Sequence, residues 1–149
     1  MPRVSAKAVI VRDDQLLVIV KRDTGGEYYA LPGGGQDDFE TLPEAVRREC
    51  LEEIGVDVEV GELLCVRDYI ARNHEFAAHQ PEVHQVELLF SCRVAADCTP
   101  RVGEVPDDGQ EGVAWLPLAA LAAARLYPAA LRLALAAPGR SGGYLGDVN

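Results

Sequence analysis

Apolar and polar residues alternate along several stretches of this chain with the period of two that β-strands show. Two of these stretches flank Asp13 and Asp14, a pair that favours a tight turn, so the first two strands should form a hairpin. A shorter alternating stretch, 56–60, precedes the third strand. The strands are predicted over 4–11, 16–21, 63–70, 83–94 and 112–116.

The pattern changes to that of a helix after Thr41. Thr41 and Glu44 form a capping box with Pro43 in the first turn, where its missing N–H costs little, so a helix should begin near Leu42. Gly55 suits the C-terminal cap of this helix. One stripe of its side chains should pack on the core: Val46, Cys50 and Ile54.

The remaining segments are polar or lie near the end of the chain. Two more helices are predicted over 118–126 and 128–137, the second ended by Pro138-Gly139. The last ten residues, 140–149, contain three glycines and should form a loose or docked tail.

No repeat or linker divides the sequence, so residues 1–149 should form one domain. Loops are predicted over 23–29, 71–82 and 100–112.

Composition and charge exclude several classes of function. With a net charge of −10 and a pI near 4.7, the chain is poorly suited to bind DNA or RNA, although a metal-loaded site can hold one small polyphosphate. No apolar run approaches the roughly 18 residues of a membrane helix. The first residues run straight into a strand-like pattern, so no signal peptide is expected. Four cysteines without CxxC spacing indicate reduced thiols, so a cytoplasmic protein is expected.

Three glutamates on the first helix are candidates for chemistry. Glu49, Glu52 and Glu53 stand at i, i+3 and i+4, so their carboxylates share one face. Three like charges in such a cluster destabilise a helix unless something neutralises them. Oxygen ligands without a supporting histidine or cysteine suit Mg²⁺, with Mn²⁺ as the alternative. Taken alone, the cluster also fits a solvated acidic face.

The segment 34–56 places these glutamates in a longer pattern. It reads GGQDDFETLPEAVRRECLEEIGV and resembles the Nudix box, G-x5-E-x7-R-E-U-x-E-E-x-G-U, where U is a bulky apolar residue. Cys50 takes the first U position, and a buried cysteine behaves as a small hydrophobe. The resemblance implies a metal-dependent hydrolase with an α/β/α sandwich, a mixed sheet and the catalytic helix after a glycine-rich loop.

The resemblance also implies roles for the box residues. The Gly33 carbonyl would bind the metal, and Glu52 would be a further ligand or the general base. Arg48 and Glu40 would pair and orient the carboxylates, since Glu40 precedes the helix cap and can fold back. The catalytic set is Glu40, Arg48, Glu49 and Glu52. The metal-binding set is Gly33, Glu49, Glu52, Glu53 and Glu111.

Candidate residues also lie outside these carboxylates. Gly34 and Gly35 lack side chains and so let a phosphate approach the backbone. Glu87, on the polar face of its strand, could face the cleft and contact substrate. Glu111 lies before the last predicted strand, where many Nudix enzymes place an acidic metal ligand; surface acidity is the alternative. The chain has three histidines, whose spacing fits no zinc site: His74, His79 and His84. They are interpreted as polar loop residues; the alternative is that one of them contacts substrate or acts as a base.

The expected function is Mg²⁺-dependent pyrophosphohydrolysis of a nucleoside diphosphate linked to another moiety, or of a nucleoside triphosphate. The substrate stays open because Ala71 and Arg72 stand where ADP-ribose-type members carry a proline, and Tyr69 comes too early for the dinucleoside-polyphosphate type. A catalytically silent nucleotide-sensing module and an isomerase on the same scaffold are the alternatives. The partner would be a small nucleotide, with no nucleic acid polymer and no membrane, and a homodimer is frequent in this family.

Overall fold

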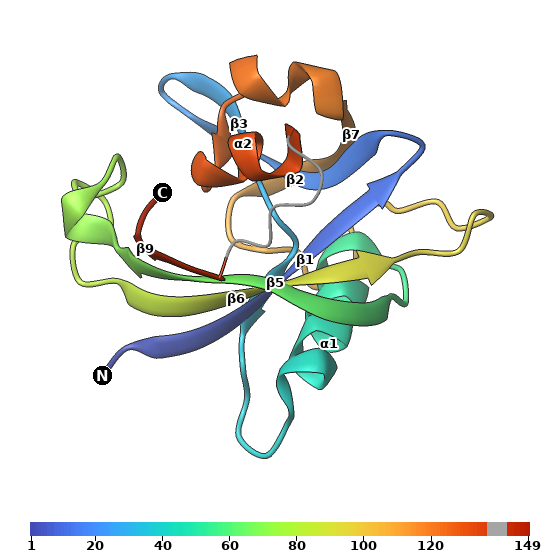
Figure 1. Ribbon diagram of the computed structural model, residues 1–149, viewed down its shortest axis with the longest axis horizontal. Helices are drawn as coiled ribbons and strands as arrows, with labels where there is room; N and C mark the ends of the chain where they lie inside the picture. The colour runs from blue at the N-terminus through green and yellow to red at the C-terminus, as the bar shows by residue number, and fades with distance from the viewer. Residues whose placement is uncertain (137–142) are drawn as a thin grey trace.

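The strands form two groups that meet at the hairpin of the first two strands (Figure 1). The computed structural model describes residues 1–136 and 143–149. Its strands are β1 (Arg3–Arg12), β2 (Gln15–Asp23), β3 (Gly26–Ala30), β4 (Gly33–Gly35), β5 (Glu59–Ile70), β6 (His84–Arg93), β7 (Gln110–Pro117), β8 (Leu126–Tyr127) and β9 (Gly143–Asp147). One group has the order β4-β1-β6-β5-β9 and the other β7-β2-β3-β8. The sheet is mixed, since β1 is parallel to β6 and antiparallel to β2 and β4.

The predicted hairpin is confirmed. Asp13 and Asp14 have φ values of 51° and 58°, a left-handed backbone conformation that aspartate tolerates better than most residues. The turn joins β1 to β2 through the pairs Val11 with Leu16 and Arg12 with Gln15.

The first helix is α1 (Leu42–Ile54), and its predicted limits are confirmed. The Glu44 N–H donates to Thr41 Oγ1 at 3.4 Å, and the Thr41 N–H donates to the Glu44 carboxylate at 2.6 Å. Gly55 ends the helix with a φ of 68°, and its N–H donates to the Leu51 carbonyl. The capping box and the glycine cap therefore fix where the helix begins and ends.

Helices cover both faces of the sheet, so the predicted α/β/α arrangement is confirmed (Figure 1). The 3-10 helices are η1 (Ala71–Asn73) and η2 (Leu118–Ala123), and the last helix is α2 (Ala130–Ala136). The first core packs α1 on the sheet through Val46, Cys50 and Ile54, all fully buried. The second lies below η2 and α2 around Leu121 and Leu131. Each fully buried leucine or isoleucine stabilises the fold by about 2 kcal/mol.

Several predicted loops and helices differ from the observed elements. The loop predicted over 23–29 is largely β3, because Tyr28 and Tyr29 pair with β2. The helix predicted over 118–126 is the shorter η2, because Leu126 and Tyr127 leave the helical path to pair with β3 as β8. At β3 a hairpin with the preceding strand β2 replaces the predicted loop, and at β8 pairing with a strand far away in sequence overrides local propensity.

The end of the chain contributes to the sheet. Of the predicted tail 140–149, the residues of β9 pair in parallel with β5, so this part is docked. Asp147 accepts hydrogen bonds from the Ile70 N–H at 3.0 Å and from Asn73 at 2.8 Å. The predicted helix end at Pro138-Gly139 lies outside the described residues. No helix in the described part of the chain has the length and apolar character needed to cross a membrane.

Candidate active site

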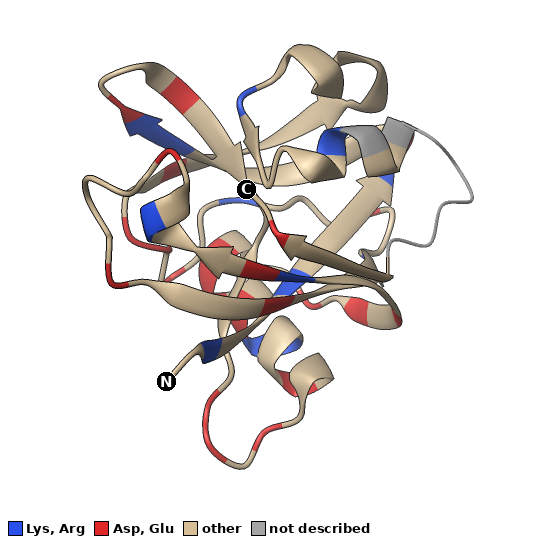
Figure 2. Ribbon diagram, turned by 60° about the vertical axis from the view of Figure 1, so that its left-hand side comes forward, with Lys and Arg blue, Asp and Glu red and all other residues tan. Residues whose placement is uncertain are grey.

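A cavity of about 600 Å³ lies beside the glycine run of β4. Its lining joins β1, β4, α1 and the loop before β7. In Figure 2, basic and acidic positions of the ribbon, blue and red, lie close together near the middle of the molecule. The cations that line the cavity are Arg3, Lys7, Lys21 and Arg67, and the acidic residues include Glu49, Glu87 and Asp107.

Glu53 is the most buried carboxylate of the site. Its residue is 2% exposed, and Oε1 accepts the Gly33 N–H at 3.1 Å. Its Oε2 has no hydrogen-bond partner among the described residues. Burial raises the pKa of Glu53 to about 8, an effect that the nearby charge of Lys7 partly opposes. An unpartnered buried carboxylate oxygen is costly, so this atom points to a ligand that is absent from the protein alone.

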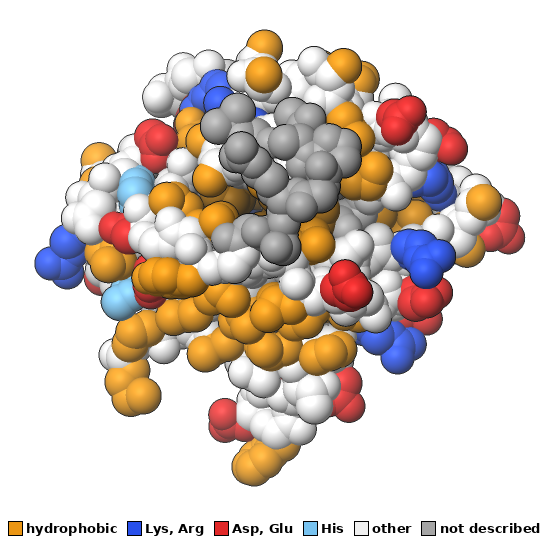
Figure 3. Space-filling view, viewed as in Figure 1, with side chains coloured by type: hydrophobic (Ala, Val, Ile, Leu, Met, Phe, Trp, Pro, Cys, Tyr) orange, Lys and Arg blue, Asp and Glu red, His pale blue; other side chains and the backbone are white. Residues whose placement is uncertain are grey.

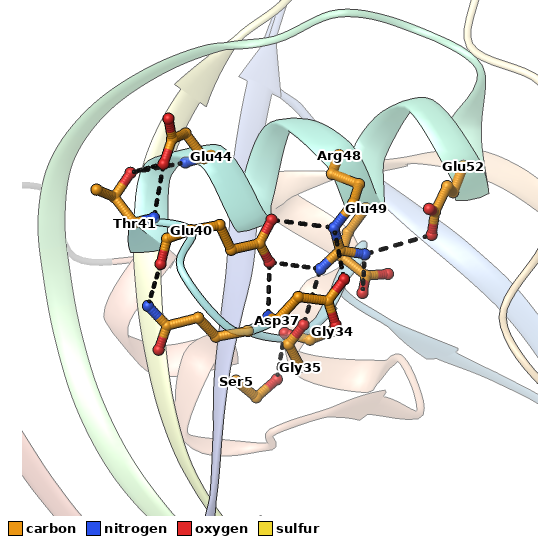
Figure 4. A network of polar contacts seen from close by, with 11 residues as sticks. Ser5, Gly34, Gly35, Asp37, Glu40, Thr41, Glu44, Arg48, Glu49 and Glu52 are labelled. Carbon is orange, nitrogen blue, oxygen red and sulfur yellow. Dashed lines mark hydrogen bonds and ion pairs between the residues drawn. The ribbon is translucent and has the colours of Figure 1, made fainter.

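Arg48 holds the rest of the acidic face together (Figure 4). Its Nε and Nη2 donate to the two carboxylate oxygens of Glu40 at 3.1 and 2.6 Å, which is the pairing that the resemblance implies. Its Nη1 donates to Glu49 at 2.9 Å and lies 3.5 Å from Glu52. Its Nη2 also donates to the Gly35 carbonyl at 2.9 Å. The hydrogen bonds from Arg48 lower the pKa of Glu40, and the bond from Arg48 to the Gly35 carbonyl joins the helix to β4.

Two positions of β4 require glycine because atoms of neighbouring segments lie very close to the backbone there. A Cβ at Gly33, where φ is +133°, would lie 2.3 Å from the Ala6 carbonyl oxygen. A Cβ at Gly34 would lie 2.6 Å from the Glu49 carboxylate. Both distances are far inside van der Waals contact, so a side chain at either position would displace the strand or the carboxylate. The glycine run therefore keeps backbone groups open beside the glutamates.

The donor atoms suit a hard divalent cation, although they do not converge on one point here. Among the described residues, no three His, Cys, Asp or Glu side chains form a group that could share one ion. The reason is visible in the contacts: Arg48 holds Glu49 and Glu52, and Lys7 Nζ donates to the Gly33 carbonyl at 2.9 Å. All donors are oxygens, which Mg²⁺ and Mn²⁺ prefer, and Glu53 Oε2 is free to bind one.

Glu53 should make the metal-free protein less stable as the pH rises. Its folded pKa of about 8 lies above the ordinary 4.5, so between these values the folded state keeps a proton that the unfolded chain loses. The contribution of Glu53 to the free energy of unfolding is fully present below about pH 4.5 and is lost as the pH rises through about 8. Thermal melts of chelator-treated protein at about pH 5 and pH 8.5 should therefore differ more for the wild type than for Glu53→Gln. Equal pH dependences would contradict the burial argument.

The other candidate residues divide between the cavity and the surface. Gly34, Gly35 and Glu87 line the cavity, and Glu87 is 5% exposed and ion-paired with Arg67 at 2.7 Å. Glu111 does not reach the cavity: it pairs with Arg22 at 3.3 Å. Of the histidines, His79 lines the cavity, whereas the other two contact carboxylates of β9 and β5.

Sequence reasoning missed several residues of the cavity. Asp107, four residues before Glu111, lines it and pairs with Lys21 at 2.6 Å. The sequence pattern predicts Lys7 only as a strand residue, and the pairing of β1 with β4 at Gly33 brings it to the site. Phe76 and Tyr127 also line the cavity, beside Tyr28, and no local pattern of the sequence brings these two aromatic side chains there. For Asp107, the acidic run in the loop was the available signal.

Comparison with known proteins agrees with the box. A family model of the NUDIX domain matches residues 1–136. The chain belongs to the NUDIX family. A MutT NUDIX hydrolase from Burkholderia pseudomallei, known as a crystal structure, is similar to this Nudix chain with 38% identity and a TM-score of 0.62, over 80% of this chain and 85% of that one. The Nudix fold predicted from the box is thus confirmed.

Relatives with given names extend the comparison. A MutT-like protein of Streptomyces ambofaciens is 43% identical over 74% of this Nudix chain and 69% of its own length. The nucleoside triphosphatase NudI of Salmonella agona is 30% identical over 56% of this chain and 63% of its own length. An ADP-ribose pyrophosphatase of Methanocaldococcus jannaschii is 32% identical over 60% and 49%. This protein is therefore a Nudix hydrolase, an enzyme that acts on phosphoanhydride bonds.

Proposed function

We propose that this Nudix hydrolase is a Mg²⁺-dependent pyrophosphohydrolase that cleaves a nucleoside diphosphate linked to another moiety, or a nucleoside triphosphate. The observation that carries the proposal is the unpartnered oxygen of Glu53. The other oxygen of this buried carboxylate accepts the N–H of Gly33, and Gly33 lines a cavity whose cations suit phosphates. Enzymes of this family generally need a divalent metal ion. Mg²⁺ is the choice because all available donors are oxygens, and Mn²⁺ is the alternative.

The residues of the acidic face would have distinct roles. Glu49, Glu53 and the Gly33 carbonyl would hold the metal, and Glu52 would be a further ligand or the base that takes a proton from water. Arg48 and Glu40 would position these groups without touching substrate, because their hydrogen bonds join the helix to the β4 backbone. When bound, the metal would neutralise charge on the phosphates and lower the pKa of a water molecule.

The rest of the cavity suits a nucleotide. Phe76 has its ring centroid 5.4 Å from that of Tyr28 and 5.2 Å from that of Tyr127. Such an aromatic group offers a surface on which a planar base can stack. Arg3 and Lys21 add positive charge for the phosphates. The names of two relatives, an ADP-ribose pyrophosphatase and a nucleoside triphosphatase, agree with this class of substrate.

Product analysis with a nucleotide panel tests the proposal. The panel contains ADP-ribose, other nucleoside diphosphate derivatives and the nucleoside triphosphates, each with Mg²⁺ and with a chelator. We expect a nucleoside monophosphate and a phosphorylated remainder from diphosphate derivatives, or pyrophosphate from triphosphates, and no product with the chelator. Tight nucleotide binding without any product would instead favour the nucleotide-sensing module.

Location and assembly are also part of the proposal. All four cysteines are free, with Cys98 half-buried and the other three buried, which suits a reducing cytoplasm. We propose a homodimer because proteins of this family are frequently dimers. Hydrophobic side chains gather across the face seen in Figure 3, and Leu63 on β5 and Tyr144 on β9 are among the exposed large ones. Sedimentation analysis would distinguish the monomer from the dimer.

A further inference from the structure

Lys7 contacts the carbonyl oxygen that the proposed function gives to the metal. Its Nζ donates to the Gly33 carbonyl at 2.9 Å. Lys7 and Gly33 are directly paired across β1 and β4, and the lysine side chain folds over the glycine. A Cβ at Gly33 would lie 3.0 Å from Lys7 Cδ, so the glycine makes room for this contact. The ammonium group is therefore held in place by the strand register.

The same small region contains the unpartnered carboxylate. Gly33 donates its N–H to Glu53 Oε1, while its carbonyl accepts from Lys7. Burial raises the pKa of Glu53, and among the surrounding charges that of Lys7 opposes this rise most. Arg48 neutralises the neighbouring Glu49 in a similar way. The cations of Lys7 and Arg48 therefore offset part of the negative charge of the acidic helix face, which answers its like-charge problem.

We propose that Lys7 takes the cation position at the Gly33 carbonyl in the metal-free protein, gives it up when the divalent ion binds, and then binds a substrate phosphate. The inference rests on the proposed function, which supplies the metal and the phosphate. An ammonium group and a divalent ion cannot both lie against one carbonyl oxygen without strong repulsion. Because Lys7 lines the cavity, its released ammonium group remains within it.

Metal affinity of a Lys7 variant tests the exchange. In Lys7→Met the metal no longer competes with the ammonium group, so calorimetry should show tighter Mn²⁺ binding, by about tenfold for the loss of one charged hydrogen bond. The KM for the best substrate should rise at the same time, because a phosphate contact is lost. Lys7→Gln, which keeps a neutral polar side chain, should change both quantities in the same directions and serves if the methionine variant does not fold.

Lys21→Met is the matched control. It removes one positive charge from the same cavity, but its partner is Asp107 and not Gly33. Its Mn²⁺ affinity should change clearly less than that of Lys7→Met. Unchanged or weaker Mn²⁺ binding in both Lys7 variants would overturn the exchange while leaving the proposed function intact. A wild type that binds no metal and cleaves no nucleotide would overturn the proposed function itself.

The wild-type protein offers a direct readout, since Lys7 and Lys21 are the only lysines of the sequence. Protein labelled with ¹³C at lysine Cε should give two resonances in an NMR spectrum. Saturating Mg²⁺ should shift the Lys7 resonance and leave that of Lys21 nearly in place. A Lys7 resonance that does not move at a Mg²⁺ concentration shown by calorimetry to fill the site would overturn the exchange.

Discussion

Replacing Glu49, Glu52 or Glu53 by glutamine should lower kcat by two or more orders of magnitude. Each change keeps the size of the side chain but removes one carboxylate from the metal-binding face, and the loss of a ligand or base typically costs this much. The metal-free melting temperature should stay the same or rise slightly. The Glu49 and Glu52 variants remove a negative charge from a like-charged cluster, and the Glu53 variant removes a buried carboxyl group whose ionisation is costly. Turnover and thermal melts with a chelator, on the same preparations, measure both effects.

Glu62→Gln is the control for the glutamate series. Glu62 is exposed on β5 outside the cavity, so the variant has the same change in net charge without touching the site. Its turnover should equal that of the wild type. Near-normal turnover in all three site variants would show that the carboxylates are not needed and would favour the nucleotide-sensing module.

Replacing Arg48 by glutamine should both destabilise the fold and remove most of the activity. Arg48 donates to Glu40, Glu49 and the Gly35 carbonyl, and its side chain is 28% exposed. Losing this network should cost about 2 kcal/mol of unfolding free energy, since Glu40 keeps a partly buried charge without its partner. Activity should fall because the helix and β4 lose their alignment. Urea unfolding and kcat are the measurements.

Arg47→Gln is the matched control for Arg48. The neighbouring Arg47 pairs with Asp57, and both side chains are more than half exposed. Exposed pairs of this kind contribute little, so the change in unfolding free energy should be below about 0.5 kcal/mol and turnover should be unchanged. Equal destabilisation by the two arginine variants would mean that the Arg48 network does not hold the site together.

Local signals made the catalytic helix predictable from sequence. The capping box at Thr41, the glycine cap at Gly55 and the spacing of the glutamates all act within one helix, and the structure matches them. The resemblance to the Nudix box predicted the pairing of Arg48 with Glu40, two residues that lie eight positions apart in the chain. Both the catalytic helix and this pair therefore depend on short separations along the chain.

Contacts between distant segments were not predictable in the same way. Lys7 reaches Gly33 only through the register of β1 with β4, which no local pattern specifies. β8 and β9 are short or glycine-rich, and each pairs with a strand far away in sequence. Among the acidic residues before β7, the loop path decides that Asp107 lines the cavity while Glu111 meets Arg22 on the surface. Spacing alone favoured Glu111.

Calorimetric titration of chelator-treated protein with Mn²⁺ shows whether the acidic face of α1 binds a metal ion. The wild type and Glu62→Gln should bind the ion with the same affinity, and binding should raise their melting temperatures. Glu49→Gln and Glu53→Gln should bind it at least about tenfold more weakly, since each loses a charged ligand. Wild-type protein that binds no Mn²⁺ at millimolar concentration, or equal affinity in all four proteins, would show that the carboxylates of α1 do not form a metal site.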